Sequence, residues 1–155
     1  MIASSTYPVG IIGVGNMGGA MAANLLAHGW PVHVNDVVDS KMQALAALGA
    51  AVHSDAAQTA CNSELVIVCV VDAVQTNDAL FGHNGAVNHM QSGQCVMLCP
   101  TIAPEDVEVC THKLAALGIQ TIDSPMSGGP VRARDGRMSL MLACADAVFE
   151  KYQTL

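Results

Sequence analysis

Residues 10–25 read GIIGVGNMGGAMAANL, and this stretch decides the fold. An apolar run of strand length, residues 9–14, leads into the pattern Gly13-x-Gly15-x-x-Gly18, and a helical run opens at residue 16 or 17 and continues to about residue 28. A dinucleotide-binding loop needs this order of strand, glycine turn and helix. Gly13 lets the chain turn sharply, Gly15 lets a pyrophosphate approach the backbone, and Gly18 lets the helix lie close against the sheet. The N–H groups and the dipole at the helix N-terminus favour the bound anion.

The glycine pattern also fits an ordinary turn between a strand and a helix, so the residues that follow decide between the two. Asp36 stands just after the next apolar run, residues 32–34, where the fingerprint places an acid that accepts hydrogen bonds from a ribose diol. The next residue is Val37 and not an arginine, so a 2′-phosphate would meet a carboxylate with no nearby guanidinium. This pair of residues favours NAD over NADP as the cofactor.

Strands and helices alternate along the whole chain. We expect strands at 9–14, 32–34, 51–53, 65–70, 95–98, 119–122 and 138–142, and helices at 16–28, 41–48, before 61, at 72–80, 104–117 and from 145 to the chain end at 155. Ser40 is expected to cap the second helix, Ser54 or Asp55 the third, and residues 124–130 are expected to form a loop. The pattern predicts one domain, residues 1–155, with an α/β fold: a Rossmann-like, doubly wound, mostly parallel sheet with helices on both faces. Ligands on such sheets bind beyond the carboxyl ends of the strands, so the loops at 70–73, 100–102 and 124–130 also matter.

The composition excludes several classes of function. The net charge of −7, with only six Lys and Arg, argues against a nucleic-acid surface, and the longest apolar run, residues 65–71, is too short to span a membrane. Six cysteines form no C-x-x-C pair and the histidines are scattered, which indicates reduced core thiols in a cytoplasmic protein and no metal site. The 52% of apolar residues indicates a sheet covered on both faces or an apolar face meant for a partner.

Three motifs, in order along the chain, resemble the 3-hydroxyisobutyrate (β-hydroxyacid) dehydrogenase family, which is related to 6-phosphogluconate dehydrogenase. Residues 13–25 resemble its GxGxMGxxMAxNL opening, residues 101–104 (TIAP) its S-T-I-x-P segment, and residues 123–129 (DSPMSGG) its D-A-P-V-S-G-G loop. Residues 72–75 with 80–82 are most similar to L-threonate dehydrogenase-like members. The family uses a nicotinamide cofactor to oxidise the hydroxyl of a small hydroxy acid.

The resemblance implies a role for individual residues. The implied cofactor-binding residues are Gly13, Gly15, Asn16, Met17, Gly18, Asp36, Val70, Val71, Gln75 and Thr101, and the implied substrate-binding residues are Ser127, Gly128 and Gly129. A hydroxyl beside glycine N–H groups makes a small nest for a carboxylate, although the same residues also fit a Gly-Gly-Pro turn. Arg132, Arg134 and Arg137 follow this loop, either as solvated charges or as groups that draw an anionic substrate toward the site.

The chain departs from the family pattern in three places. Pro100 replaces a serine near the nicotinamide, and Ala143-Cys144 replaces two glycines. The family's general acid/base is a lysine in a G-x-x-x-K-x-x-N pattern, and none of Lys41, Lys113 and Lys151 lies in such a pattern. The chain therefore holds no predicted catalytic residue. We expect it to be the N-terminal half of an enzyme about twice as long, which needs a helical C-terminal domain for turnover and which forms homo-oligomers as the family does.

Two other functions remain open at this point. A non-catalytic nucleotide-binding module, acting as a redox sensor or a scaffold, fits the short length and the absent lysine. An S-adenosylmethionine-binding transferase shares a glycine loop and an acidic strand end, but it does not account for the Met-Gly step in residues 17–18 or for the Ser-Gly-Gly loop.

Overall fold

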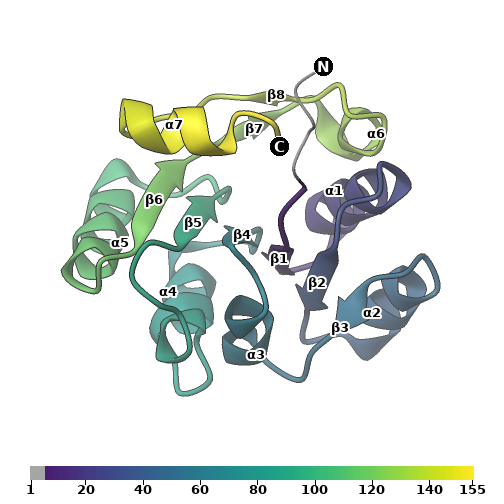
Figure 1. Ribbon diagram of the computed structural model, residues 1–155, viewed down its shortest axis with the longest axis horizontal. Coiled ribbons are helices and arrows are strands. Elements are labelled where there is room, and N and C mark those ends of the chain that lie inside the picture. Colours follow the sequence, from purple (N-terminus) through teal and green to yellow (C-terminus); the bar gives the residue numbers. More distant parts are fainter. Residues whose placement is uncertain (1–5) are drawn as a thin grey trace.

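A six-stranded, fully parallel sheet forms the centre of the molecule in a computed structural model that describes residues 6–155. The strand order is β3-β2-β1-β4-β5-β6, with direct pairing between the neighbours (Figure 1). The strands are β1 (Val9–Ile12), β2 (Val32–Asn35), β3 (Ala51–Val52), β4 (Leu65–Val68), β5 (Cys95–Leu98) and β6 (Gln120–Asp123). The order reverses between β1 and β4, which is the switch point where doubly wound sheets bind ligands. The predicted Rossmann-like fold is confirmed.

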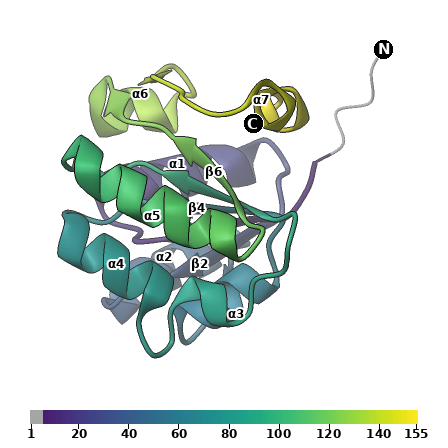
Figure 2. The ribbon, with the colours of Figure 1, turned by 90° about the vertical axis from the view of Figure 1, so that its left-hand side faces the viewer.

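Helices cover both faces of this sheet, and each face has its own hydrophobic core. One core involves α1 (Asn16–Ala27), α2 (Asp39–Ala46), α6 (Gly129–Arg134) and α7 (Asp146–Tyr152). The other involves α3 (Ala56–Cys61), α4 (Ala73–Phe81), the short 3₁₀ turn η1 (Ala86–Asn88) and α5 (Pro104–Ala116). Figure 2 shows α3, α4 and α5 side by side in front of the strands. Strands β1, β4 and β5 are buried along their whole length, which explains their continuous apolar sequences.

Local signals set where several helices begin. Asp55 and Asp72 each accept a hydrogen bond from the backbone N–H three residues on, at 2.8 Å, and so cap α3 and α4. Pro104 opens α5 with two acids in its first turn, as the sequence predicts. The prediction for Ser40 was wrong, because α2 begins at Asp39, after Val38, and no side chain caps it.

The region after β6 differs most from the sequence prediction. The expected loop at 124–130 contains β7 (Met126–Ser127) and the start of α6, and the expected strand at 138–142 shrinks to β8 (Ser139–Leu140). These two short strands pair antiparallel with each other outside the main sheet, while an isolated bridge joins Asp123 to Ala143. The pairing partner comes from a later turn of the chain, so local pattern does not reveal it. The last helix also ends earlier than expected, at Tyr152.

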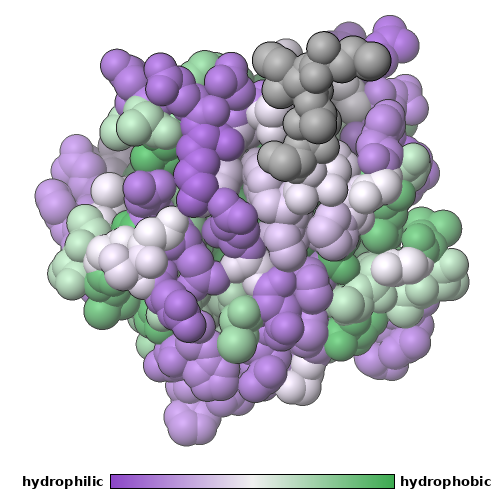
Figure 3. Space-filling model, in the orientation of Figure 1, coloured by the Kyte–Doolittle hydropathy of each residue, from purple (hydrophilic) through white to green (hydrophobic). Residues whose placement is uncertain are grey.

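Apolar side chains also reach the surface. Figure 3 shows hydrophobic colour gathered along its right-hand edge, over α1 and α2, and polar colour down the middle of the same face. Leu48, which follows α2, is one of the exposed large hydrophobic residues, together with Val131 of α6 and Phe149 of α7. Within residues 6–155, no helix has the length and apolar character needed to cross a membrane.

Candidate nucleotide-binding site

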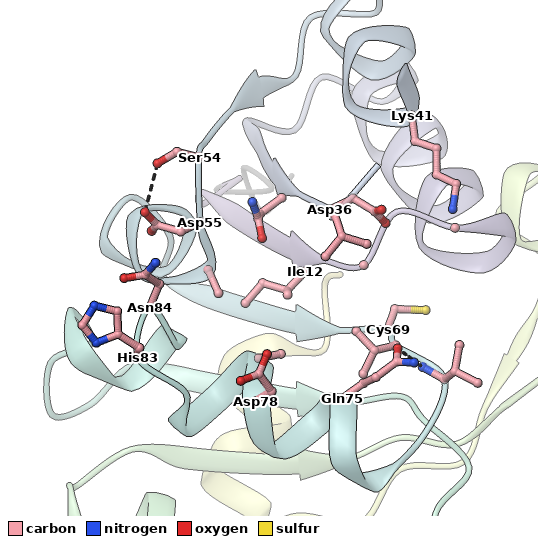
Figure 4. Close-up of a pocket in the computed structure, with 18 residues that line it drawn as sticks. Ile12, Asp36, Lys41, Ser54, Asp55, Cys69, Gln75, Asp78, His83 and Asn84 are labelled. Atoms are coloured by element: carbon pink, nitrogen blue, oxygen red, sulfur yellow. Dashed lines mark hydrogen bonds between the residues drawn. The ribbon is translucent and has the colours of Figure 1, made fainter. Parts of the chain in front are cut away.

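A cleft of about 800 Å³ opens at the carboxyl ends of β1, β2 and β4, beside the switch point of the sheet (Figure 4). Each of these strands contributes the residues that follow it. Gly13 and Gly15 come after β1, Asp36 after β2, and Val70 and Val71 after β4. Tertiary structure therefore brings together residues that the sequence separates by up to 58 positions, counted from Gly13 to Val71.

The three loop positions Gly13, Gly15 and Gly18 require glycine for different structural reasons. Gly13 has φ +90°, and a Cβ on it would lie 2.6 Å from the carbonyl oxygen of Cys69. A Cβ on Gly18 would collide with the carbonyl oxygen of Gly13, so helix α1 could not keep its position. For Gly15, no atom of residues 6–155 other than those of the glycine itself and its two chain neighbours lies within 4 Å of the place where its Cβ would be. Two of the glycines thus allow close packing, and the third leaves room above the backbone for a ligand.

The start of helix α1 lies beside this cleft, because Gly15 is one of the lining residues. Gly15 is the N-cap and makes no side-chain capping bond, and the first turn carries no acidic residue. The N–H of Gly19 donates to Gly15, whereas no acceptor within residues 6–155 binds the N–H of Asn16 or Met17. Uncapped donors at a helix N-terminus suit a phosphate group, because the helix dipole adds to the attraction.

Asp36 faces the glycine loop. Its Oδ2 accepts a hydrogen bond from the N–H of Val14 at 2.7 Å, and its Oδ1 accepts one from the N–H of Val38 at 2.8 Å. The carboxylate therefore ties the end of β2 to the loop after β1, a function that the sequence pattern does not reveal. A carboxylate has about four acceptor positions, so the contacts to Val14 and Val38 leave capacity for a sugar diol.

Lys41 is a cleft residue that the sequence analysis missed. Its side chain reaches from α2 toward the end of the cleft where Asp36 lies (Figure 4). The one ion pair formed in the described part of the chain is Lys151 with Glu64, so no carboxylate there lies within 4 Å of the Lys41 ammonium. The sequence feature that could have identified Lys41 is its position near the start of α2, the helix that follows Asp36.

Polar side chains also line the cleft. Gln75, one of the predicted cofactor-binding residues, lines the cleft, and its Oε1 accepts a hydrogen bond from the N–H of Val71 at 3.3 Å. Further lining residues that the sequence analysis did not single out for binding are Ser54, Asp55, Asp78, His83 and Asn84. In the described part of the chain, no group of three or more His, Cys, Asp and Glu residues is arranged to hold a metal ion.

Other predicted site residues lie outside the lining of this cleft. Asn16 borders a second groove between α1, α2 and α6, Met17 packs against the core, and Gly18 is buried. Thr101 is exposed just after β5, beyond the lining residues. The predicted substrate residues Ser127, Gly128 and Gly129 lie at β7 and the start of α6, with φ +122° and +72° at the two glycines. The structure does not test their binding roles, which stay predictions.

Cys69 lines the cleft beside the glycine loop, and we expect it to be a slow nucleophile. Burial raises the pKa of its thiol to about 11, and a hydrogen bond with the Gly18 backbone offsets this only in part. The reactive thiolate is then about one part in a thousand at pH 8 and increases as the pH rises toward 11. Iodoacetamide should therefore modify the exposed Cys61 first at pH 8, as read by peptide mass spectrometry. Equal rates at the two cysteines would contradict this expectation.

Comparisons with known proteins cover nearly the whole chain. Residues 8–155 match the family model described as the NAD binding domain of 6-phosphogluconate dehydrogenase. The L-threonate dehydrogenase of Escherichia coli O6:H1 is 34% identical over 154 residues, which are 97% of this chain and 50% of that protein. The chain thus spans about half the length of the curated relatives it matches.

Similar solved structures also match nearly the whole of this chain and about half of their own chains. A crystal structure of 3-hydroxyisobutyrate dehydrogenase from Salmonella typhimurium is 31% identical with a TM-score of 0.89, and the match covers 96% of this chain and 52% of that one. A structure of Psf3 in complex with NADP⁺ and 2-OPP is 29% identical with a TM-score of 0.89, and covers 94% and 51% of the two chains.

Proposed function

The chain belongs to the family of the 6-phosphogluconate dehydrogenase NAD-binding domain, and on this premise we propose that it is the cofactor domain of a hydroxyacid dehydrogenase. Such an enzyme transfers hydride between a nicotinamide cofactor and the hydroxyl carbon of a small β-hydroxy acid. The observation that carries the proposal is the cleft at the β1–β4 switch point, which is lined by Gly15, at the uncapped start of α1, and by the Asp36 carboxylate.

The residues of this chain bind and orient, and the bound nicotinamide supplies the hydride chemistry. Gly15 and the start of α1 would hold the pyrophosphate, and Asp36 would accept hydrogen bonds from the adenosine ribose. The backbone after β4, at Val70 and Val71, would border the rest of the nucleotide. A cofactor bound in this way would lie near the ends of β5 and β6, after which Thr101 and the predicted substrate loop follow.

The step that removes the hydroxyl proton is assigned to a residue outside this chain. The family lysine has no counterpart among Lys41, Lys113 and Lys151, which lie on α2, α5 and α7. We propose that residues 1–155 bind nucleotide without turnover and that a helical C-terminal domain completes the site. The length of the relatives, about twice that of this chain, supports this division. A cytoplasmic location and a homo-oligomeric state stay predictions.

The choice between NAD and NADP depends on the end of the cleft at β2. The Asp36 carboxylate opposes a 2′-phosphate, and the adjacent Val37 is fully exposed and offers no charge. Lys41 works in the other direction, because its ammonium would attract that phosphate. We propose NAD as the preferred cofactor, since two backbone hydrogen bonds hold Asp36 at the loop, whereas Lys41 is an exposed side chain without an ion-pair partner among residues 6–155.

Calorimetric titration of the 155-residue chain tests this proposal. We expect NAD to bind about tenfold more tightly than NADP, which corresponds to about 1.4 kcal/mol of repulsion at Asp36. In Lys41→Ala, the affinity for NADP should fall further while the affinity for NAD stays within about twofold. The cofactor assignment would be lost if neither nucleotide bound at millimolar concentration, and the NAD preference would be wrong if NADP bound more tightly.

A further inference from the structure

Three arginines stand close together on and after helix α6. Arg132 and Arg134 belong to α6 and Arg137 follows it, so half of the six Lys and Arg residues lie within a six-residue stretch. The chain as a whole carries a net charge of −7. This stretch therefore presents a local positive charge to anions that the rest of the surface repels.

The geometry of α6 directs these arginines to different places. Ala133 is only 2% exposed and packs in the core that includes α1, and each helical step turns by about 100°, so Arg132 and Arg134 emerge on opposite flanks. Arg134 lines the groove between α1 and α2, together with Pro130 and Val131. Arg132 instead points back toward the beginning of its helix, as helical side chains do.

Arg132 lies against the predicted substrate loop. Its Cδ is 3.0 Å and its Cβ 3.3 Å from the place where a Cβ on Gly128 would be. Gly128 is therefore glycine for two reasons, because its φ of +122° disfavours any side chain and because a side chain would displace the stem of Arg132. The aliphatic part of the exposed Arg132 side chain therefore passes close to Gly128, the middle residue of the Ser127–Gly129 loop.

The guanidinium of Arg132 has no carboxylate partner among residues 6–155. Across residues 6–155 the recorded ion pair is Lys151 with Glu64, and no carboxylate lies within 4 Å of Arg132. An exposed arginine whose five N–H donors are not paired with acids can bind a planar anion with two parallel hydrogen bonds.

We propose that Arg132 is a specificity-determining residue that binds the carboxylate of the hydroxy-acid substrate held over Ser127, Gly128 and Gly129. The inference rests on the proposed function for its substrate class. It adds to that function a side chain that binds the carboxylate of the substrate directly. It also separates Arg132 from Arg134 and Arg137, which carry the same charge in the same stretch but do not contact Gly128 in this way.

The test uses the complete gene product that carries this chain, with three single variants, Arg132→Ala, Arg134→Ala and Arg137→Ala, that remove the same charge. The probes are 3-hydroxyisobutyrate, L-threonate and, as an uncharged comparator, the methyl ester of 3-hydroxyisobutyrate. We expect Arg132→Ala to raise the KM of the acids at least about tenfold, with the KM of the ester and of NAD unchanged. The other two variants should change the KM of the acids by less than about twofold.

Each result decides the inference. Arg132→Lys should recover less than half of the loss, because an ammonium lacks the forked donors. Equal effects of the three variants, or equal loss of acid and ester in Arg132→Ala, would overturn the inference and leave the proposed function intact. If the complete protein shows no turnover, the binding of the same acids to the NADH-loaded protein is measured by calorimetric titration. Arg132-dependent binding without turnover would uphold the inference and contradict the proposed function, and no binding would overturn both.

Discussion

Gly18→Ala is expected to lower both the stability of the fold and the affinity for nucleotide more than any other single methyl group added to the loop. The new Cβ would collide with the carbonyl oxygen of Gly13, a backbone atom that cannot rotate away. Helix α1 would have to move from the sheet, and with it the core residues Ala20, Met21 and Ala22. We expect a loss of about 2–3 kcal/mol in the free energy of unfolding, measured by urea denaturation, and NAD binding weakened more than about a hundredfold.

Gly15→Ala is the matched control for this variant. Beyond Gly15 and its two chain neighbours, no atom of the described residues lies within 4 Å of the added methyl group, so the free energy of unfolding should change by at most about 1 kcal/mol. NAD affinity should nevertheless fall, because the methyl group would occupy the space above the loop that the pyrophosphate needs. Undiminished NAD binding in Gly15→Ala would place the phosphates elsewhere, and an undisturbed Gly18→Ala protein would contradict the close packing of helix and loop.

Asp36→Ala is expected to have the second largest effect, and it should act in two ways. The variant removes both acceptors of the Val14 and Val38 N–H groups, which lowers the free energy of unfolding by about 2 kcal/mol. It also removes the acceptor for the ribose diol and the repulsion toward a 2′-phosphate. NAD affinity should therefore fall at least about tenfold, and NADP affinity should fall less. Both values come from calorimetric titration.

Asp36→Asn separates the two effects. It keeps one oxygen as a backbone acceptor but carries no charge, so it should lose less stability than Asp36→Ala while still shifting the preference toward NADP. Equal losses for NAD and NADP in both variants would show that Asp36 only shapes the loop and would remove its assignment to the ribose.

Much of the fold follows from local physical chemistry, which is why the sequence alone predicts it. Continuous apolar runs such as Leu65–Val68 require burial on both faces, and acids such as Asp72 cap the helix that follows. The glycine loop is equally local, because Gly13 needs a positive φ and Gly18 a close approach within a few residues of each other. These signals identified the parallel sheet and the position of the nucleotide loop.

The rest depends on contacts between distant segments, which no local pattern encodes. The hydrogen bond from Val14 to Asp36 joins residues 22 positions apart, and it gives the acid a structural task beside its predicted one. Lys41 lies at the cleft because α2 packs beside α1. Strand β7 pairs with β8, although helix α6 separates the two strands in the sequence. By itself, then, the sequence determined the parallel α/β architecture and the phosphate-binding turn, since single residues and their neighbours dictate both. Only the tertiary structure decided which charged side chains surround that turn, because their positions depend on how whole helices pack against the sheet.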